Sequence, residues 1–255
     1  MEKAAMMARV GNRVFSGIVA ILIVVMLLYG GYSLWDTAML YRGAFVSSDL
    51  LKFKPSPNEA NHPTLAELQA INPEVRGWIT IDDTHIDYPV VQGKTDMDYI
   101  NKDVYGEFAL SGSIFMDSRN APDFSDSYCL LYGHHMDNGA MFGDVVEFVD
   151  KKYFDSHPQG TLYLVNGATY AIHIFACVEV DAFDSMVYQP TAQENGNVQP
   201  LLDYIREKAV QYRESGVTAG EQLIGLSTCA EAETNGRVII FGRMERLEQV
   251  QEGGA

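Results

Sequence analysis

The chain has 255 residues, with 18 basic and 34 acidic side chains and a formal net charge of −16 at pH 7. This acidity argues against nucleic acid as a partner, because binding to phosphates requires clustered lysine and arginine. Three cysteines, Cys129, Cys177 and Cys229, are too few and too odd in number for a disulfide scaffold, and their spacing fits no zinc site.

An uncharged, mostly apolar stretch runs from residue 14 to residue 35. As a helix it would span roughly 33 Å, about the hydrocarbon thickness of a bilayer. Three basic residues and one acidic residue precede it, which predicts that residues 1–13 are cytoplasmic and that the rest of the chain is extracellular. A cleaved secretory signal is the alternative, although the apolar run is long for one and no small-x-small cleavage site follows it.

The exported part is long enough for one large domain with a full core. Lysines and prolines interrupt any long helix over residues 36–63, which we interpret as a polar stalk. We expect the folded domain over residues 64–247 and a short tail over residues 248–255. Thr64 is a suitable N-cap for a helix over Leu65–Ile71, with Glu67 at the capping-box position.

Short strands dominate the pattern of this domain. Asn166-Gly167 is a strong hairpin signal between two of them. Helical spacing predicts two helices, over residues 143–154 and 198–213. Many short strands with few helices indicate a closed or nearly closed β-barrel. The expected strands cover residues 77–81, 85–91, 112–116, 128–132, 161–165, 169–180, 222–226 and 237–243.

Cys229 follows an apolar strand and precedes a polar stretch, so it lies where a strand end meets a loop. A lone cysteine is usually a small buried hydrophobe, which is our interpretation of Cys129 and Cys177 inside apolar strands. Arg237 begins the next strand. If the two strands are antiparallel neighbours, the guanidinium returns to the end of the sheet that holds the thiol, where it can lower the thiol pKa or stabilise an oxyanion. A solvent-facing strand arginine is the alternative.

His134 and His135 also follow a strand that is apolar enough to be buried. Neighbouring residues of a strand point to opposite faces, so both histidines would not face one site. A metal site would need more ligands than Asp137, the nearest acidic residue. One histidine acting as acid and base for a thiol is the better chemistry.

These motifs together resemble those of the class B sortases. Leu226-Ser-Thr-Cys229 is similar to the nucleophile motif of that family, Arg237 stands where its essential arginine falls, and Tyr132-Gly-His134 is similar to its histidine motif. Residues 68–79 and 111–117 also resemble class B segments, and a helix in the long connection over residues 181–221 is typical of class B. The resemblance implies an eight-stranded sortase-type β-barrel with peripheral helices, preceded here by one transmembrane helix.

The resemblance also implies an activity and a set of partners. Cys229 would attack a C-terminal sorting signal of an exported protein, and the acyl group would pass through a thioester to an amine of a peptidoglycan precursor or a pilin. His134 would be the acid and base and Arg237 the oxyanion partner, with no cofactor and no metal. A hydrolytic cysteine peptidase and a non-catalytic, membrane-anchored β-barrel binding module are the alternatives.

Candidate substrate contacts come from three places in the sequence. One segment resembles a lining of the sorting-signal groove in the family, and two residues adjoin the nucleophile. The long connection contributes one further tyrosine. The candidates are Tyr99, Ile100, Asn101, Tyr188, Ser227 and Thr228.

Overall fold

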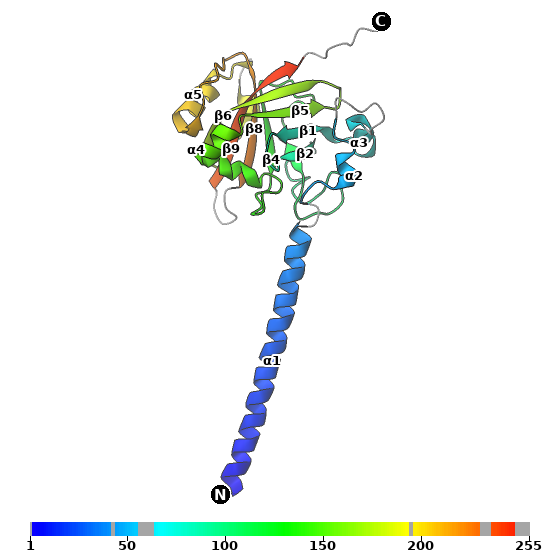
Figure 1. Ribbon diagram of the computed structural model, residues 1–255, viewed down its shortest axis with the longest axis vertical. Coiled ribbons are helices and arrows are strands. Elements are labelled where there is room, and N and C mark those ends of the chain that lie inside the picture. Colours follow the sequence, from blue (N-terminus) through cyan, green and yellow to red (C-terminus); the bar gives the residue numbers. More distant parts are fainter. Residues whose placement is uncertain (1, 42–43, 56–63, 194–195, 230–235, 248–255) are drawn as a thin grey trace. The chain divides into compact units, whose positions relative to one another are not determined.

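A computed structural model describes residues 2–41, 44–55, 64–193, 196–229 and 236–247 of the chain. The chain divides into two compact units, Met1–Arg42 and Gly43–Ala255. The first unit is one helix, α1 (Glu2–Tyr41), which continues beyond both ends of the predicted span of residues 14–35. Residues Arg9–Met39 are long and apolar enough to cross a membrane (Figure 1). This helix is therefore a candidate membrane anchor.

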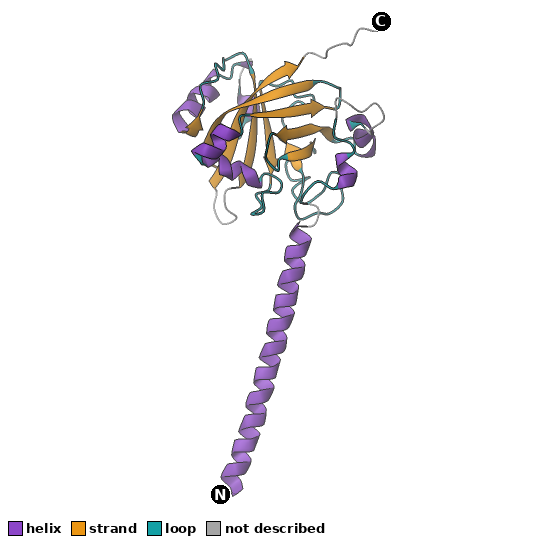
Figure 2. Ribbon diagram, in the orientation of Figure 1, coloured by secondary structure: helices purple, strands orange, loops and turns teal. Residues whose placement is uncertain are grey.

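The second unit is mostly β, with short helices at its periphery (Figure 2). Helix α3 begins with the predicted capping box between Thr64 and Glu67. In chain order its elements are α2 (Ser48–Leu51), α3 (Leu65–Ile71), β1 (Val75–Ile81), β2 (Asp87–Val91), β3 (Ile114–Met116), β4 (Tyr128–Gly133), η1 (Gly143–Val149), α4 (Lys151–Ser156), β5 (Gln159–Leu164), β6 (Thr169–Asp181), η2 (Pro190–Ala192), α5 (Gln199–Lys208), β7 (Ala209–Tyr212), β8 (Gln222–Cys229) and β9 (Gly236–Leu247).

The strands form a closed barrel. Within the described residues, one sheet has the order β5-β1-β2-β3-β4-β8-β9-β6-β7, and β5 also pairs with β6. That second pairing closes eight strands into a ring and leaves β7 as an addition on the edge of β6. β5 and β6 are the predicted hairpin, with Gly167 at φ 85° in its turn. The predicted eight-stranded barrel is confirmed.

Three apolar clusters fill and cover this barrel. The barrel core takes alternate side chains from the strands, among them Ile79, Leu131, Cys129, Cys177, Leu226 and Ile240. Both of these cysteines are buried, as predicted. The α5 core lies between the outer face and α5, and includes Leu130, Val178, Ile239, Leu201 and Ile205. The α3 core lies beneath α3, and includes Trp78, Phe115, Leu65, Leu68, Tyr99 and Val104. Figure 1 shows α5 and α3 on opposite sides of the barrel.

Two predicted helices were wrong in part. The helix expected over residues 143–154 is divided at Asp150, where the backbone is extended. The Asp150 side chain accepts a hydrogen bond from the Tyr153 N–H and so caps a second helix, α4. The helix expected over residues 198–213 ends at Lys208. Residues Ala209–Tyr212 instead pair antiparallel with β6, because the edge of β6 beyond β5 is open to another strand.

Barrel closure depends on a close approach of β5 to β1 at Gly160. A Cβ added there would collide with the Thr80 carbonyl oxygen. We expect Gly160→Ala to lower the free energy of unfolding by about 2 kcal/mol, because the two strands must separate to accept the methyl group. Denaturant unfolding measures this change.

Gly220→Ala is the matched control, since a Cβ at Gly220 meets nothing within 4 Å. We expect it to change the free energy of unfolding by less than about 0.5 kcal/mol. Equal changes for the two variants would contradict a tight β1–β5 seam.

Candidate active site

The pairing of β4, β8 and β9 places the three predicted catalytic residues at one end of the barrel. β4 and β8 are parallel, with Gly133 opposite Thr228. His134 and Cys229 each follow that pair directly in the sequence. β8 and β9 are antiparallel neighbours, the condition under which the sequence brings Arg237 back to the thiol, with Cys229 opposite Arg237. The side chain of Cys229 lies outside the described part of the structure, but its backbone position follows from this register.

His134 is half-buried, and a backbone carbonyl fixes its orientation. Its Nε2 lies 2.8 Å from the Ile100 carbonyl oxygen. Because a carbonyl only accepts hydrogen bonds, Nε2 carries a proton, which leaves Nδ1 as the nitrogen that can take up and release one. The loop after His134 folds back on it, since the Phe142 N–H donates to the His134 carbonyl at 3.0 Å.

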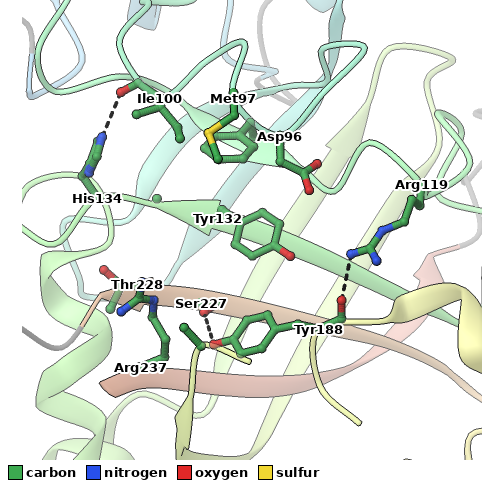
Figure 3. Close-up of a pocket in the computed structure, with 13 residues that line it drawn as sticks. Asp96, Met97, Ile100, Arg119, Tyr132, His134, Tyr188, Ser227, Thr228 and Arg237 are labelled. Atoms are coloured by element: carbon green, nitrogen blue, oxygen red, sulfur yellow. Dashed lines mark hydrogen bonds between the residues drawn. The ribbon is translucent and has the colours of Figure 1, made fainter. Parts of the chain in front are cut away.

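His134 and Arg237 line the same cavity, which has a volume of about 330 Å³. In Figure 3, His134, Thr228 and Arg237 gather at one end of this cavity, and Arg119 lies at the other. The Arg237 guanidinium donates to the Gly236 carbonyl at 2.9 Å. The full lining consists of Asp96, Met97, Ile100, Phe115, Arg119, Tyr132, Gly133, His134, Ala182, Tyr188, Ser227, Thr228 and Arg237.

A buried carboxylate organises the far end of the cavity. Asp117 is the residue directly after β3. Its carboxylate accepts two hydrogen bonds from the Arg119 guanidinium, at 2.8 and 2.6 Å, and one from the Tyr132 hydroxyl at 2.9 Å. Burial opposes ionisation of Asp117, but the hydrogen bonds from Arg119 and Tyr132 outweigh it and hold its pKa below the ordinary value. The same pairing raises the pKa of Arg119.

Tyr188 forms a wall of the cavity and is held on three sides. Its hydroxyl is 2.9 Å from the Ser227 Oγ, and its carbonyl accepts a hydrogen bond of 2.8 Å from Arg119 (Figure 3). Its ring stacks on Tyr132, with centroids 6.3 Å apart. The wall is therefore connected both to strand β8 and to the Asp117 network.

The structure separates the six predicted substrate contacts into two groups. Ile100, Tyr188, Ser227 and Thr228 line the cavity. Tyr99 lies outside it, buried in the α3 core, where its hydroxyl accepts from Asn72 and donates to Glu74. Asn101 is exposed and also lies outside the cavity lining.

Seven of the thirteen described lining residues were not among the predicted site residues, and Asp96, Met97 and Arg119 are the charged or flexible ones among them. Asp96 and Met97 belong to the irregular segment between β2 and β3, which carries no motif. Arg119 follows the segment of residues 111–117 that resembles class B enzymes, and its closeness to Asp117 was the available signal. His135 lies 3.4 Å from Asp137, and the described residues contain no group of three or more potential metal ligands.

Asp117→Asn tests the carboxylate network. We expect it to lower the free energy of unfolding at pH 7 by about 2 kcal/mol, because Arg119 and Tyr132 lose a charged acceptor. A depressed native pKa stabilises the fold above the unfolded pKa of about 3.9, and this contribution is lost as the pH falls through the native value. The difference from wild type should therefore narrow below about pH 4.

Urea unfolding between pH 3 and pH 7 measures this difference. Asp155→Asn, which removes only an exposed i,i+4 ion pair with Lys151, is the control and should change stability by less than about 0.5 kcal/mol. A difference in the free energy of unfolding between wild type and Asp117→Asn that stays constant with pH would contradict a depressed pKa of Asp117.

Comparisons with known proteins agree with this geometry. The sortase domain family model matches residues 79–245. Sortase B of Listeria monocytogenes is 34% identical over 183 residues, which cover 71% of this chain and 73% of that protein. A solved class B sortase of Streptococcus pyogenes, involved in pilus biogenesis, is 42% identical with a TM-score of 0.65, covering 70% of this chain and 96% of that one.

A second solved structure, sortase B from the type II pilus of Streptococcus pneumoniae, is 39% identical with a TM-score of 0.60 and covers 70% of this chain and 96% of that one. Neither of the alternative functions is favoured by these relatives. The chain therefore belongs to the sortase family, within its class B members, and is a cysteine transpeptidase.

Proposed function

We propose that this sortase uses Cys229 as its nucleophile, His134 as its acid and base, and Arg237 as the partner of the oxyanion. The observation that carries the proposal is the strand register, with Gly133 opposite Thr228 and Cys229 opposite Arg237. His134 and Arg237 also line one cavity of about 330 Å³, a volume within the range of ordinary ligand pockets.

In the first half-reaction, the Cys229 thiolate attacks the carbonyl carbon of the threonine in a sorting signal, at the peptide bond that follows this threonine. The tetrahedral intermediate places its negative charge on the former carbonyl oxygen, where the Arg237 guanidinium donates hydrogen bonds. The C–N bond then breaks, and the imidazolium of His134 gives its Nδ1 proton to the departing amine. A thioester on Cys229 and a neutral His134 remain.

In the second half-reaction, an amine attacks the thioester carbonyl and gives its proton to Nδ1 of His134. Collapse of this intermediate forms the new amide and releases the Cys229 thiolate beside the imidazolium, which regenerates the starting pair. The Ile100 carbonyl supports both steps, because it accepts from Nε2 in the neutral and the charged imidazole alike.

The cavity walls supply substrate contacts in this proposal. Ile100, Tyr188 and Ser227 form walls near the reacting end. The Thr228 hydroxyl is buried and has no hydrogen-bond partner among the described residues, a property expected of a group whose bonding a bound peptide completes.

The partners follow from family membership, and their details are proposals. The substrate is an exported protein with a C-terminal sorting signal. We propose a pilin lysine as the acceptor, because the two relatives linked to pili are 42% and 39% identical, whereas the Listeria sortase B is 34% identical. The excess of basic residues over residues 1–13, which precede the apolar stretch of α1, supports a cytoplasmic N-terminus and an extracellular catalytic unit.

Single substitutions test the three catalytic roles. We expect Cys229→Ala to abolish transfer, His134→Ala to lower kcat/KM about 10³-fold and Arg237→Ala about 10²-fold, because each removes a different part of the chemistry. The assay follows cleavage of an internally quenched sorting peptide. Cys177→Ala, which alters a buried core cysteine, is the control and should retain transfer. Retention of wild-type kcat/KM by any of the three variants would refute its assigned role.

Competition between amines tests the acceptor. We expect Nα-acetyl-lysine amide, a probe for a pilin side chain, to capture the acyl group about tenfold better than triglycine, a probe for a peptide α-amine. Mass spectrometry of the products, with both amines at equal concentration, gives the ratio. Preference for triglycine would contradict a pilin acceptor, and hydrolysis unaffected by either amine would favour a peptidase.

A further inference from the structure

Residues 44–54, which lie in the sequence between α1 and the expected start of the domain at residue 64, pack against the barrel. We call them the tether segment. Ala44 is fully buried in the barrel core, and Val46 packs against both the barrel core and the α3 core. Lys54 forms an ion pair of 2.8 Å with Asp87 at the start of β2. The tether segment is therefore packed into the second unit, whereas the sequence analysis placed these residues in a polar stalk.

One buried hydroxyl connects the tether segment to the loop that carries His134. The Tyr88 hydroxyl donates to the Ala44 carbonyl at 3.1 Å and accepts from the Met141 N–H at 2.8 Å. Tyr88 is 5% exposed, and burial raises its pKa to about 12. The hydroxyl thus stays protonated at any physiological pH and can donate and accept at once.

Met141 occupies a position from which it can set the loop geometry. It has φ +55°, a left-handed conformation that is costly for a methionine and persists only when its surroundings impose it. Met141 forms a β-bridge with His135, and the N–H of the next residue, Phe142, holds the His134 carbonyl. The bond from Met141 to Tyr88 therefore fixes the base of the loop whose first residue is His134.

The tether segment also supports the other contact of His134. Ile100, whose carbonyl holds Nε2, packs against the α3 core, as do Leu50 and Phe53 of the tether segment. A further strut runs through Phe45, whose ring edge meets His85 with centroids 5.7 Å apart. The His85 N–H and Nδ1 bond to the Asp144 carboxylate, just beyond the same loop, at 2.7 and 3.0 Å.

We propose that Tyr88 is a positioning residue for His134, through which the tether segment sets the geometry of the acid–base group. This inference rests on the proposed function of His134. Both supports of the imidazole, the loop base at Met141 and the carbonyl of Ile100, then depend on chain that lies directly after the membrane-anchor candidate. The tether segment is in this way part of the active site.

Tyr88→Phe in the full chain, purified in detergent micelles, tests the proposal. Removing the hydroxyl frees the loop base without leaving a cavity, so we expect kcat to fall about tenfold while KM stays within about twofold, because substrate contacts are untouched. The limb of the pH–rate profile that belongs to His134 should move as well, a change that a merely structural loss would not cause. The probe is the same internally quenched sorting peptide that the transfer assay uses.

Tyr170→Phe is the matched control, since Tyr170 also belongs to the barrel core but lies on β6, outside these contacts. It should keep the wild-type kcat and pH profile. An unchanged kcat and pH profile in Tyr88→Phe would overturn the proposal, and so would equal losses in both variants with equal falls in melting temperature.

Two further variants complete the test. Phe45 is 46% exposed, so Phe45→Ala should fold even if Tyr88→Phe does not, and we expect kcat about threefold lower with KM unchanged. A wild-type kcat in Phe45→Ala would contradict the claim that the tether segment sets the geometry of His134. His134→Ala distinguishes failure of the proposed function from failure of the positioning role of Tyr88. If this variant keeps its activity, the proposed function fails, and the positioning role fails with it. An inactive His134→Ala beside a fully active Tyr88→Phe would overturn the positioning role alone.

Discussion

The pairing of β8 with its two neighbours is the constraint on which the site depends. β8 runs parallel to β4 and antiparallel to β9, and the pairs Gly133–Thr228 and Cys229–Arg237 fix which residues end at the same rim. Because side chains alternate along a strand, a shift of one residue in either pairing would turn one of the proposed catalytic side chains to the opposite face. Barrel closure between β5 and β6 leaves little freedom for such a shift.

Around that rim, His134 and Arg237 each contact a neutral backbone carbonyl. The Ile100 carbonyl orients His134 at 2.8 Å without placing a charge beside the imidazole. The paired Asp117 and Arg119 lie at the other end of the cavity, where they hold Tyr132 and the carbonyl of Tyr188. The ion pair that holds the cavity walls is thereby separated from His134 and Arg237.

Local signals in the sequence predicted much of this structure, and long-range packing decided the rest. The Thr64 capping box, the Asn166-Gly167 turn and the antiparallel return from Cys229 to Arg237 are each specified within a few residues. The end of α5 at Lys208 depends on the free edge of β6, which no local pattern reveals. The burial of Tyr99, the position of Arg119 and the packing of residues 44–54 likewise depend on partners far away in the chain.

The most direct measurement is mass spectrometry of the full chain after brief incubation with a panel of sorting peptides, followed by peptide mapping of the adduct. The account predicts an acyl group on Cys229 that an added amine removes. Buried Cys129 and Cys177 should carry none, because burial raises the pKa of both thiols. Cleavage of a peptide with an adduct on another residue, or with no covalent intermediate at all, would contradict the account.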